Sequence, residues 1–300
     1  MSRGDRLLAW GTGLALGVVV VAIATLFGTA LVEGAPRVDL AFFVESPDAS
    51  MVGGGIAPAL VGTALATLAM TLAGVPVGVA TGIWLAEYAP RAGRFGPRLA
   101  TLVRAAVANL AGVPSIVFGL FGLGFFVLFV GRGIDHVLVG EDGPAVWGQP
   151  GLLWASLTLA VLTLPVVIVT TEEALRAVPD TLREAALGVG ATRLQTTFRV
   201  VLPKAAPGIW TGVVLAVGRG AGEVAPLLFT GAANYLPELP NDPRDMFMHL
   251  GFHVYALATQ SPDVDAARPT LFATVLVLLG LAFALNLVAN LLRARARRMA

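Results

Sequence analysis

The chain has 300 residues, of which 56% are hydrophobic and 13% are charged, whereas a soluble globular domain carries about 25% charged residues. Its 20 basic and 19 acidic side chains, with a net charge of +1, are too few to cover the surface of a water-soluble protein of this length, so the composition excludes that class. Cysteine is absent, which also excludes disulfides and thiolate metal sites. We therefore expect an integral membrane protein.

Six apolar segments follow one another along the chain. Five of them are charge-free over at least 24 residues, which exceeds the length of about 20 residues that crosses the hydrocarbon core. Because the segments are continuously apolar rather than alternating, they predict helices instead of membrane strands. We expect one all-α transmembrane domain over residues 1–300, with six transmembrane helices. These helices are expected near residues 7–32, 56–88, 99–130, 152–173, 207–232 and 270–292.

Basic residues gather on one side of these expected helices. The N-terminus, the loops after the second and fourth helices and the C-terminal tail hold 15 of the 20 Lys and Arg residues. The alternate loops hold four of them, together with 12 of the 19 acidic residues. The positive-inside rule therefore predicts a multi-pass protein of the cytoplasmic membrane with both termini in the cytoplasm.

The chain has no nucleotide-binding signature. Its single lysine, Lys204, is followed by Ala205, so it lacks the Gly-Lys-Ser/Thr ending of a phosphate-binding loop. If transport consumes ATP, another chain must bind it. We expect this chain to be non-catalytic, to hold no cofactor or metal of its own, and to contact the lipid bilayer and no nucleic acid.

A hydrophilic segment at residues 172–203 connects the fourth and fifth expected helices. It contains residues that typically begin or end a helix. Thr181 and Glu184 have the spacing of a capping box. Gly190 marks the end of a short helix, and Pro203 marks the end of the next one. An amphipathic helix lying on the inner leaflet is one interpretation of this pattern.

A spaced motif in the same segment supports a second interpretation. The motif consists of Glu184-Ala185-Ala186, Gly190, Val200 and Leu202-Pro203. It resembles the EAA loop of ABC importer permeases, in which isoleucine usually stands at the position of Val200. The resemblance implies that this loop forms a coupling helix that docks into a cleft on a cytoplasmic ATPase subunit. We favour docking over the lipid-surface interpretation.

Arg219 and Glu223 lie inside the fifth expected helix. A charge at mid-bilayer costs about 2.5–3.5 kcal/mol on insertion scales, so such residues usually face a partner or a wet pathway. Residues four apart share a helix face, and a structural ion pair supported by close packing at Gly218 and Gly222 is one interpretation. The other is anion handling, because a guanidinium binds phosphate or carboxylate oxygens in a bidentate way.

From the second expected helix onward the chain resembles the PstA-type permeases of high-affinity phosphate ABC importers. The matching residues are Gly112–Gly122, Thr170–Pro179, the EAA loop, Arg219 and Gly222–Leu227. Val224 stands where the family commonly has threonine. The resemblance implies the type I ABC importer fold, alternating access and a role for Arg219 in phosphate translocation. It also implies a PstC-type permease subunit, two copies of an ABC ATPase and an extracytoplasmic phosphate-binding protein as partners.

Two rival functions stay open beside the phosphate permease. One is a permease of the same kind for another oxyanion or an organic solute. The other is an ATP-independent anion carrier or channel gated by the Arg219–Glu223 pair. The EAA loop distinguishes them, because a carrier has no use for a segment that docks on an ATPase.

Weaker features are Asn109 and Ser115, which either line the pathway or bond between helices. Asp245, His249 and His253 lie at four-residue spacing. On a helix they share a face that can bind zinc, but their apolar neighbours favour an ordinary interfacial helix.

Overall fold

The computed structural model describes residues 3–50, 52–140 and 143–299, and every regular element in these ranges is helical. The α-helices are α1 (Arg3–Thr29), α2 (Leu40–Val44), α3 (Ala57–Ile83), α4 (Phe95–Ala111), α5 (Ser115–Phe121), α6 (Arg132–Leu138), α7 (Leu152–Arg176), α8 (Asp180–Gly188), α9 (Arg193–Thr196), α10 (Leu202–Gly222), α11 (Leu227–Thr230), α12 (Leu250–Thr259) and α13 (Val264–Met299). Shorter π- or 3-10-helical segments adjoin them: η1 (Ala30–Gly34), η2 (Ala35–Arg37), η3 (Trp84–Tyr88), η4 (Ala89–Arg91), η5 (Gly122–Gly131) and η6 (Thr197–Val201).

Six helical stretches in the described ranges are long and apolar enough to cross a membrane. They cover Leu8–Arg37, Ala57–Arg91, Ser115–Leu138, Leu152–Arg176, Arg193–Gly222 and Val264–Val288. The expected all-α fold with six transmembrane helices is therefore confirmed. The side chains of the terminal arginines, which contribute to the predicted orientation, lie outside the described part of the structure.

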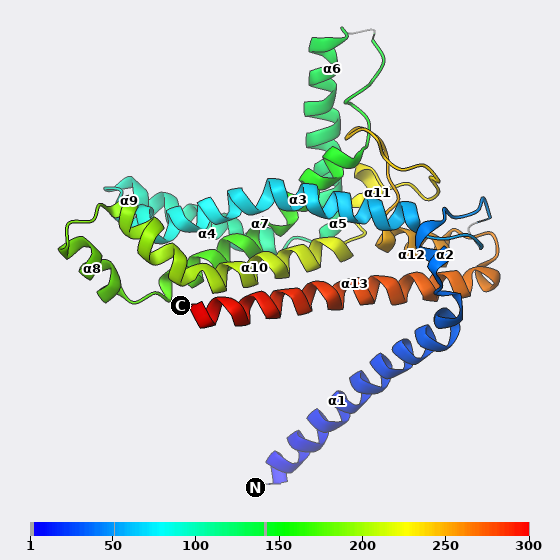
Figure 1. The fold of residues 1–300 in the computed structure, drawn as a ribbon, viewed down its shortest axis with the longest axis horizontal. Coiled ribbons are helices and arrows are strands. Elements are labelled where there is room, and N and C mark those ends of the chain that lie inside the picture. The colour runs from blue at the N-terminus through cyan, green and yellow to red at the C-terminus, as the bar shows by residue number, and fades with distance from the viewer. Residues whose placement is uncertain (1–2, 51, 141–142, 300) are drawn as a thin grey trace.

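Helix α7 forms the centre of the bundle, with α3 and α10 packed against it and α13 covering α10 (Figure 1). In its most apolar stretch 61% of the residues are buried, against 6% for α1. Small residues allow the close approach: a Cβ on Gly78 would lie 2.7 Å from Val167 Cγ1, and one on Gly82 would lie 2.6 Å from Thr171 Cβ. Helix association of this kind is typical of membrane proteins, where backbones pack closely at small residues.

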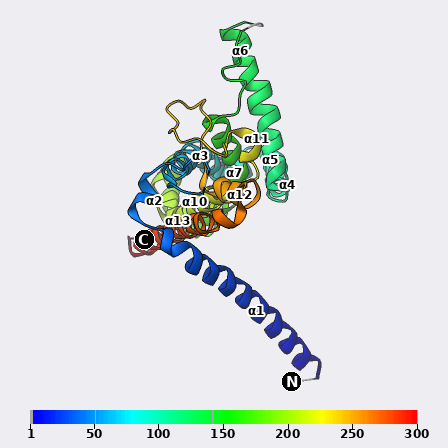
Figure 2. The ribbon, with the colours of Figure 1, turned by 90° about the vertical axis from the view of Figure 1, so that its right-hand side faces the viewer.

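Helix α1 leaves the bundle, and its N-terminal end lies far from the other helices (Figures 1 and 2). Its large apolar side chains, such as Leu14 and Val18, are exposed. An ion pair between Glu33 and Arg268 ties its C-terminal extension to the start of α13 at 2.8 Å. A helix that is apolar all round and exposed suits lipid or a partner subunit rather than water.

The third expected helix, 99–130, is interrupted in the structure. Helix α4 ends at Ala111, and Pro114 adopts an extended backbone with ψ of 140° before α5 begins at Ser115. Proline disfavours helical backbone at the residue before it, so the Gly-Val-Pro sequence separates two helices. The third membrane-crossing stretch is Ser115–Leu138, and the prediction of one continuous helix from 99 was wrong.

The fifth expected helix, 207–232, is also wrong at its end. Helix α10 stops at Gly222, and Glu223 has an extended backbone with ψ of 137°. Two features explain the stop, because glycines weaken the last turn and Pro226 disfavours helical backbone just before it. The non-helical stretch packs against protein, since a Cβ on Gly119 would lie 2.8 Å from Pro226 Cα. Such backbone is tolerated at membrane depth only where protein or a cavity surrounds it.

The two ends of the bundle differ. Helices α8 and α9 lie at one end, whereas α2, α11 and α12 lie at the other (Figure 1). Helix α10 connects them, since it begins beside α9 and ends at the break near α11. The Arg219 region and the α8–α9 region are therefore separated by about the thickness of a membrane, because a helix rises by about 1.5 Å per residue.

Candidate functional site

The intramembrane charged pair lies at the break in the fifth crossing. Arg219 is in the last turn of α10 and Glu223 is the first residue after it. Arg219 Nε lies 3.2 Å from Glu223 Oε1, with 45% and 16% of the two side chains exposed. The ion pair inferred from the i,i+4 spacing therefore forms, but across the end of a helix rather than along one face. A cation in a last turn also interacts favourably with the helix dipole.

Arg219 contributes the only charged side chain among the described residues that line a cavity of about 310 Å³. The other walls come from α4, α5 and α7, and they are apolar except for Thr170. A single guanidinium in a low-dielectric wall exerts a stronger attraction on an anion than it would in water. Because only one carboxylate accompanies Arg219, the guanidinium keeps donors for an oxyanion.

The structure does not bring Asn109 or Ser115 into the described lining of this cavity. Asn109 is exposed on α4, next to the lining residues Ala108 and Leu110. Ser115 is half-buried at the first position of α5. Their role in the pathway stays a prediction.

The proposed coupling segment consists of α8, a turn and α9. Glu184 and Ala185 are exposed, and Ala186 is half-buried. Gly190 follows the end of α8 with φ of +88°, a conformation that only glycine adopts readily. A Cβ at this position would meet nothing within 4 Å, so the backbone conformation, not space, requires glycine here.

The predicted start of one helix and the predicted end of another in this segment were wrong. The N-cap of α8 is Pro179, without a side-chain cap, so Thr181 and Glu184 form no capping box. The structure instead builds a capping box at α9, where Gln195 N donates to Thr192 Oγ1 at 3.3 Å and the Gln195 side chain accepts from Thr192 N at 2.8 Å. The segment therefore has a capped second helix rather than a capped first one.

Pro203 does not end a helix. It lies in the first turn of α10, and the chain stays helical from α9 through η6 into α10. Because the helix is continuous, Pro203 removes one backbone hydrogen bond from it, and the π-helical turn η6 lies just before it. Leu202 is half-buried and packs with Val201 and Ala205 in the apolar cluster at the base of α10. The second helix of the coupling segment, α9, is thus continuous with the fifth crossing.

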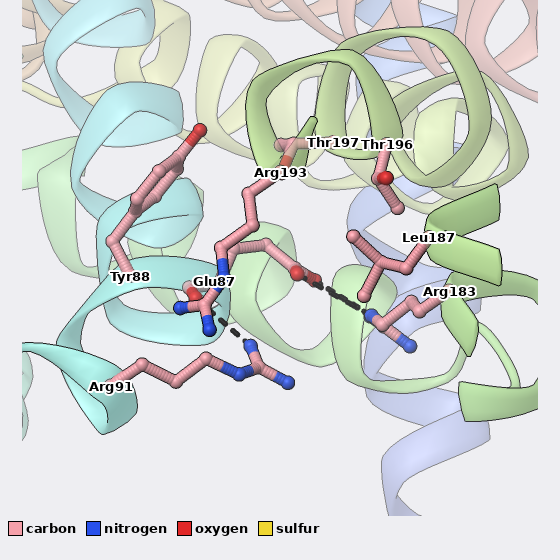
Figure 3. Close-up of a pocket in the computed structure, with 8 residues that line it drawn as sticks. All are labelled: Glu87, Tyr88, Arg91, Arg183, Leu187, Arg193, Thr196 and Thr197. Atoms are coloured by element: carbon pink, nitrogen blue, oxygen red, sulfur yellow. Dashed lines mark hydrogen bonds and ion pairs between the residues drawn. The ribbon is translucent and has the colours of Figure 1, made fainter. Parts of the chain in front are cut away.

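A buried ion pair between residues far apart in the chain fixes α8 to η3, just after α3 (Figure 3). Arg183 Nη2 lies 2.7 Å from Glu87 Oε1, with 10% and 7% of the side chains exposed. Arg183 also donates to the carbonyl oxygens of Val178 at 2.6 Å and Leu175 at 2.8 Å. The guanidinium therefore joins three segments: η3, the end of α7 and α8.

A second ionic cluster lies at the same end of the bundle. Glu172 accepts a hydrogen bond from Arg104 Nε at 2.8 Å and forms an ion pair with Arg176, whose Nη2 lies 2.6 Å from Glu172 Oε1. Arg104 also donates to the carbonyl oxygen of Leu85 at 3.1 Å. Sequence reasoning missed both clusters, although Glu87 and Glu172 each end an apolar run and stand among arginines.

Asp245, His249 and His253 do not share a helix, because α12 begins at Leu250. Asp245 accepts from the backbone N–H groups of Asn241 and Asp242. The imidazole nitrogens of both histidines are buried without a hydrogen-bond partner among the described residues, and burial lowers the pKa of each side chain to about 4. No metal-binding group of three is found in the described part of the chain.

Comparison with known proteins places these features in a family. Residues 74–298 match the family of binding-protein-dependent transport system inner membrane components. The chain therefore belongs to this family of membrane permeases. It is 32% identical to a probable ABC transporter permease protein, YqgI, of Bacillus subtilis over 87% of this chain and 86% of that protein.

The similarity extends to phosphate permeases. The phosphate transport system permease protein PstA of Xylella fastidiosa (strain Temecula1) is 35% identical, over 73% of this chain and 72% of that one. PstA of Haemophilus influenzae is 38% identical over 69% and 65% of the two chains. These relatives agree with the resemblance seen in the sequence motifs.

Solved structures share the fold. A chain of a bacterial alginate ABC transporter aligns with a TM-score of 0.65 at 18% identity, covering 98% of this chain and 95% of that one. A chain of the inward-facing MetNI methionine ABC transporter aligns with a TM-score of 0.56 at 20% identity, over 80% and 95%. The fold is therefore that of the type I ABC importer permeases, as expected.

Proposed function

We propose that this chain is one permease subunit of an ATP-driven phosphate importer and that it forms half of the translocation pathway. The observation that carries the proposal is the guanidinium of Arg219 in the wall of an otherwise uncharged cavity, in a chain similar to PstA proteins along most of its length. Guanidinium binds phosphate oxygens in a bidentate way, and conduction needs binding weak enough for release. Glu223 moderates the attraction and holds Arg219 in place.

Coupling to ATP is proposed to run through the segment from α8 to α10. The exposed face of α8 includes Glu184 and Ala185, and its buried face is anchored to η3 by Arg183. Movement of α8 by a docked ATPase would reach α10 through the turn at Gly190, because α9, η6 and α10 beyond that turn are continuous. Arg219 lies at the far end of α10, so displacement of the continuous α9–η6–α10 helix would move the charged residue of the pathway.

The proposed assembly contains a PstC-type permease as the other half, two ABC ATPase subunits that bind the ATP, and an extracytoplasmic phosphate-binding protein. The positive-inside rule puts both termini and the α8–α9 end in the cytoplasm. The exposed basic residues at that end of the bundle, such as Arg94, Arg98 and Arg199, fit this orientation.

The ATP-independent carrier has less support. A carrier needs no exposed, glycine-hinged segment at one end of its fifth crossing, whereas an importer driven by an ATPase does. The test is labelled-phosphate uptake by vesicles that contain the partner subunits, with and without this chain. ATP-dependent uptake only in its presence supports the proposal, and equal uptake without ATP supports the carrier.

Replacement of Gly190 by alanine is expected to weaken co-purification with the ATPase about fivefold to thirtyfold. A side chain in the left-handed conformation costs roughly 1–2 kcal/mol, so the turn that presents α8 would shift. Gly188→Ala is the matched control, because Gly188 is as open to solvent but ends a right-handed helix. Pull-down at graded ATPase concentration measures both. Equal binding by the two variants would contradict a coupling role for the Gly190 turn.

A further inference from the structure

A small pocket lies where the end of the second crossing meets the coupling segment (Figure 3). It is formed by η3 and η4 on one side and by α8, α9 and η6 on the other, with a cavity volume of about 60 Å³. Its lining residues are Glu87, Tyr88, Arg91, Arg183, Leu187, Arg193, Thr196 and Thr197. A cavity of this volume holds a few water molecules. Pockets for drug-sized ligands are much larger, at about 300–1,000 Å³.

The pocket carries an excess of positive charge. Three of its four charged lining residues are arginines, and the single carboxylate, Glu87, is engaged by Arg183 at 2.7 Å. Arg91 donates to the carbonyl oxygen of Glu87 at 3.0 Å. Arg91 and Arg193 are both exposed, and neither has an ion-pair partner among the described residues. Both side chains extend toward Glu87, from the second crossing and from α9 respectively (Figure 3).

The neutral lining also offers a hydrogen-bond donor without an acceptor. The hydroxyl of Tyr88 is buried and has no hydrogen-bond partner among the described residues. Buried polar groups nearly always have a partner, and an exception needs a bound water, an ion or a functional role. Thr196 already donates its hydroxyl to the carbonyl oxygen of Thr192 at 3.0 Å. In Figure 3 this hydroxyl points away from the guanidinium groups of Arg91 and Arg193, so it does not belong to the arginine cluster.

An anion satisfies the two unpaired arginines. Two guanidinium groups that face the same small space repel one another, and a shared anion converts that repulsion into charge-assisted hydrogen bonds. Arginine pairs especially well with phosphate oxygens, and a phosphate group fits where a nucleotide does not. We propose that Arg91 and Arg193 form a binding site for a phosphate group, supplied either by free phosphate or by the headgroup of a phosphomonoester lipid.

This site is separate from the translocation residue. Arg193 and Arg219 lie at opposite ends of the continuous α9–η6–α10 rod, 26 residues apart in the chain, or about 39 Å at about 1.5 Å per residue. A ligand that joins Arg91 to Arg193 ties the end of α3 to the rod, next to the Arg183–Glu87 pair that ties it to α8. A bound phosphate group therefore restrains movement of the coupling segment relative to the end of the second crossing.

The test uses the full chain with Arg219→Gln as background, so that phosphate binding at the translocation residue cannot contribute. In nanodiscs of phosphatidylcholine, labelled inorganic phosphate is measured by equilibrium binding. In a second arm, discs containing phosphatidic acid are analysed by native mass spectrometry for retained lipid. The variants are Arg91→Gln with Arg193→Gln, and the matched control is Arg98→Gln, an exposed arginine of α4 outside the pocket.

We expect the paired substitution to weaken binding of at least one probe by more than about tenfold, since each charged hydrogen bond contributes about 1.5–3 kcal/mol, whereas Arg98→Gln leaves binding unchanged. Loss of phosphate binding identifies free phosphate as the ligand, and loss of lipid retention alone identifies the headgroup. Unchanged binding of both probes would overturn the proposal. So would weaker ATPase co-purification without a change in either probe, which would assign the two arginines to a protein contact. Neither outcome depends on phosphate uptake.

Discussion

Replacement of Arg219 by glutamine is expected to reduce phosphate uptake more than about tenfold while the protein still inserts into the membrane. The substitution removes charge-assisted hydrogen bonds to the anion, each contributing about 1.5–3 kcal/mol. It also removes an intramembrane charge that opposes insertion, and the glutamine amide can still donate a hydrogen bond to Glu223, so the amount of folded protein should not fall. Uptake of labelled phosphate by reconstituted importer, normalised to the permease content of the membrane, measures the effect.

Two further variants separate anion binding from structural support. Arg219→Lys keeps the charge but loses the planar fork of donors, so uptake should fall between wild type and Arg219→Gln. Glu223→Gln should reduce uptake less than Arg219→Gln, and combining the two should add nothing, because Glu223 acts through Arg219. Arg98→Gln on the neighbouring helix is the control. Near-normal uptake by Arg219→Gln would show that the pair serves only packing.

Replacement of Arg183 by methionine is expected to destabilise the protein by roughly 3–5 kcal/mol, because it leaves the buried carboxylate of Glu87 without a partner. The effect should be local first, since Arg183 holds α8 against η3 and the end of α7. Thermal unfolding in detergent measures the loss of stability. Limited proteolysis at residues 180–196 reports the release of α8 from the bundle.

The double variant Glu87→Gln with Arg183→Met should recover part of this stability, because it removes both charges instead of stranding one. Arg199→Met is the matched control, since Arg199 is exposed on the adjacent η6. A single Arg183→Met variant as stable and as protease-resistant as the control would contradict the anchoring role of the ion pair.

The sequence predicted the helical fold because each crossing carries its own signal, a long apolar run. It failed at the two interruptions. The Gly-Val-Pro sequence before Ser115 and the glycine-rich end of α10 are apolar enough to look like membrane helix. Whether such residues kink a helix or end it depends on the protein packed around the exposed backbone, and a single sequence does not contain that information.

The candidate site was predicted in part for the same reason. Arg219 and Glu223 are four residues apart, so their contact follows from local geometry. Glu87 and Arg183 are 96 residues apart, and Arg104 and Glu172 are 68 apart. Their pairing depends on how α3, α4, α7 and α8 pack. Acidic residues at the ends of apolar runs, among arginines, are the signal that could have drawn attention to them.

Competition for labelled-phosphate uptake is the most direct test of the proposed function. It uses the complete importer, reconstituted with its ATPase, its second permease and its binding protein. We expect uptake that requires ATP, that excess unlabelled phosphate abolishes, and that equal excesses of sulfate or molybdate leave nearly unchanged. Inhibition by sulfate or molybdate as strong as that by phosphate, or uptake that proceeds without ATP, would contradict the assignment of this chain to an ATP-driven phosphate importer.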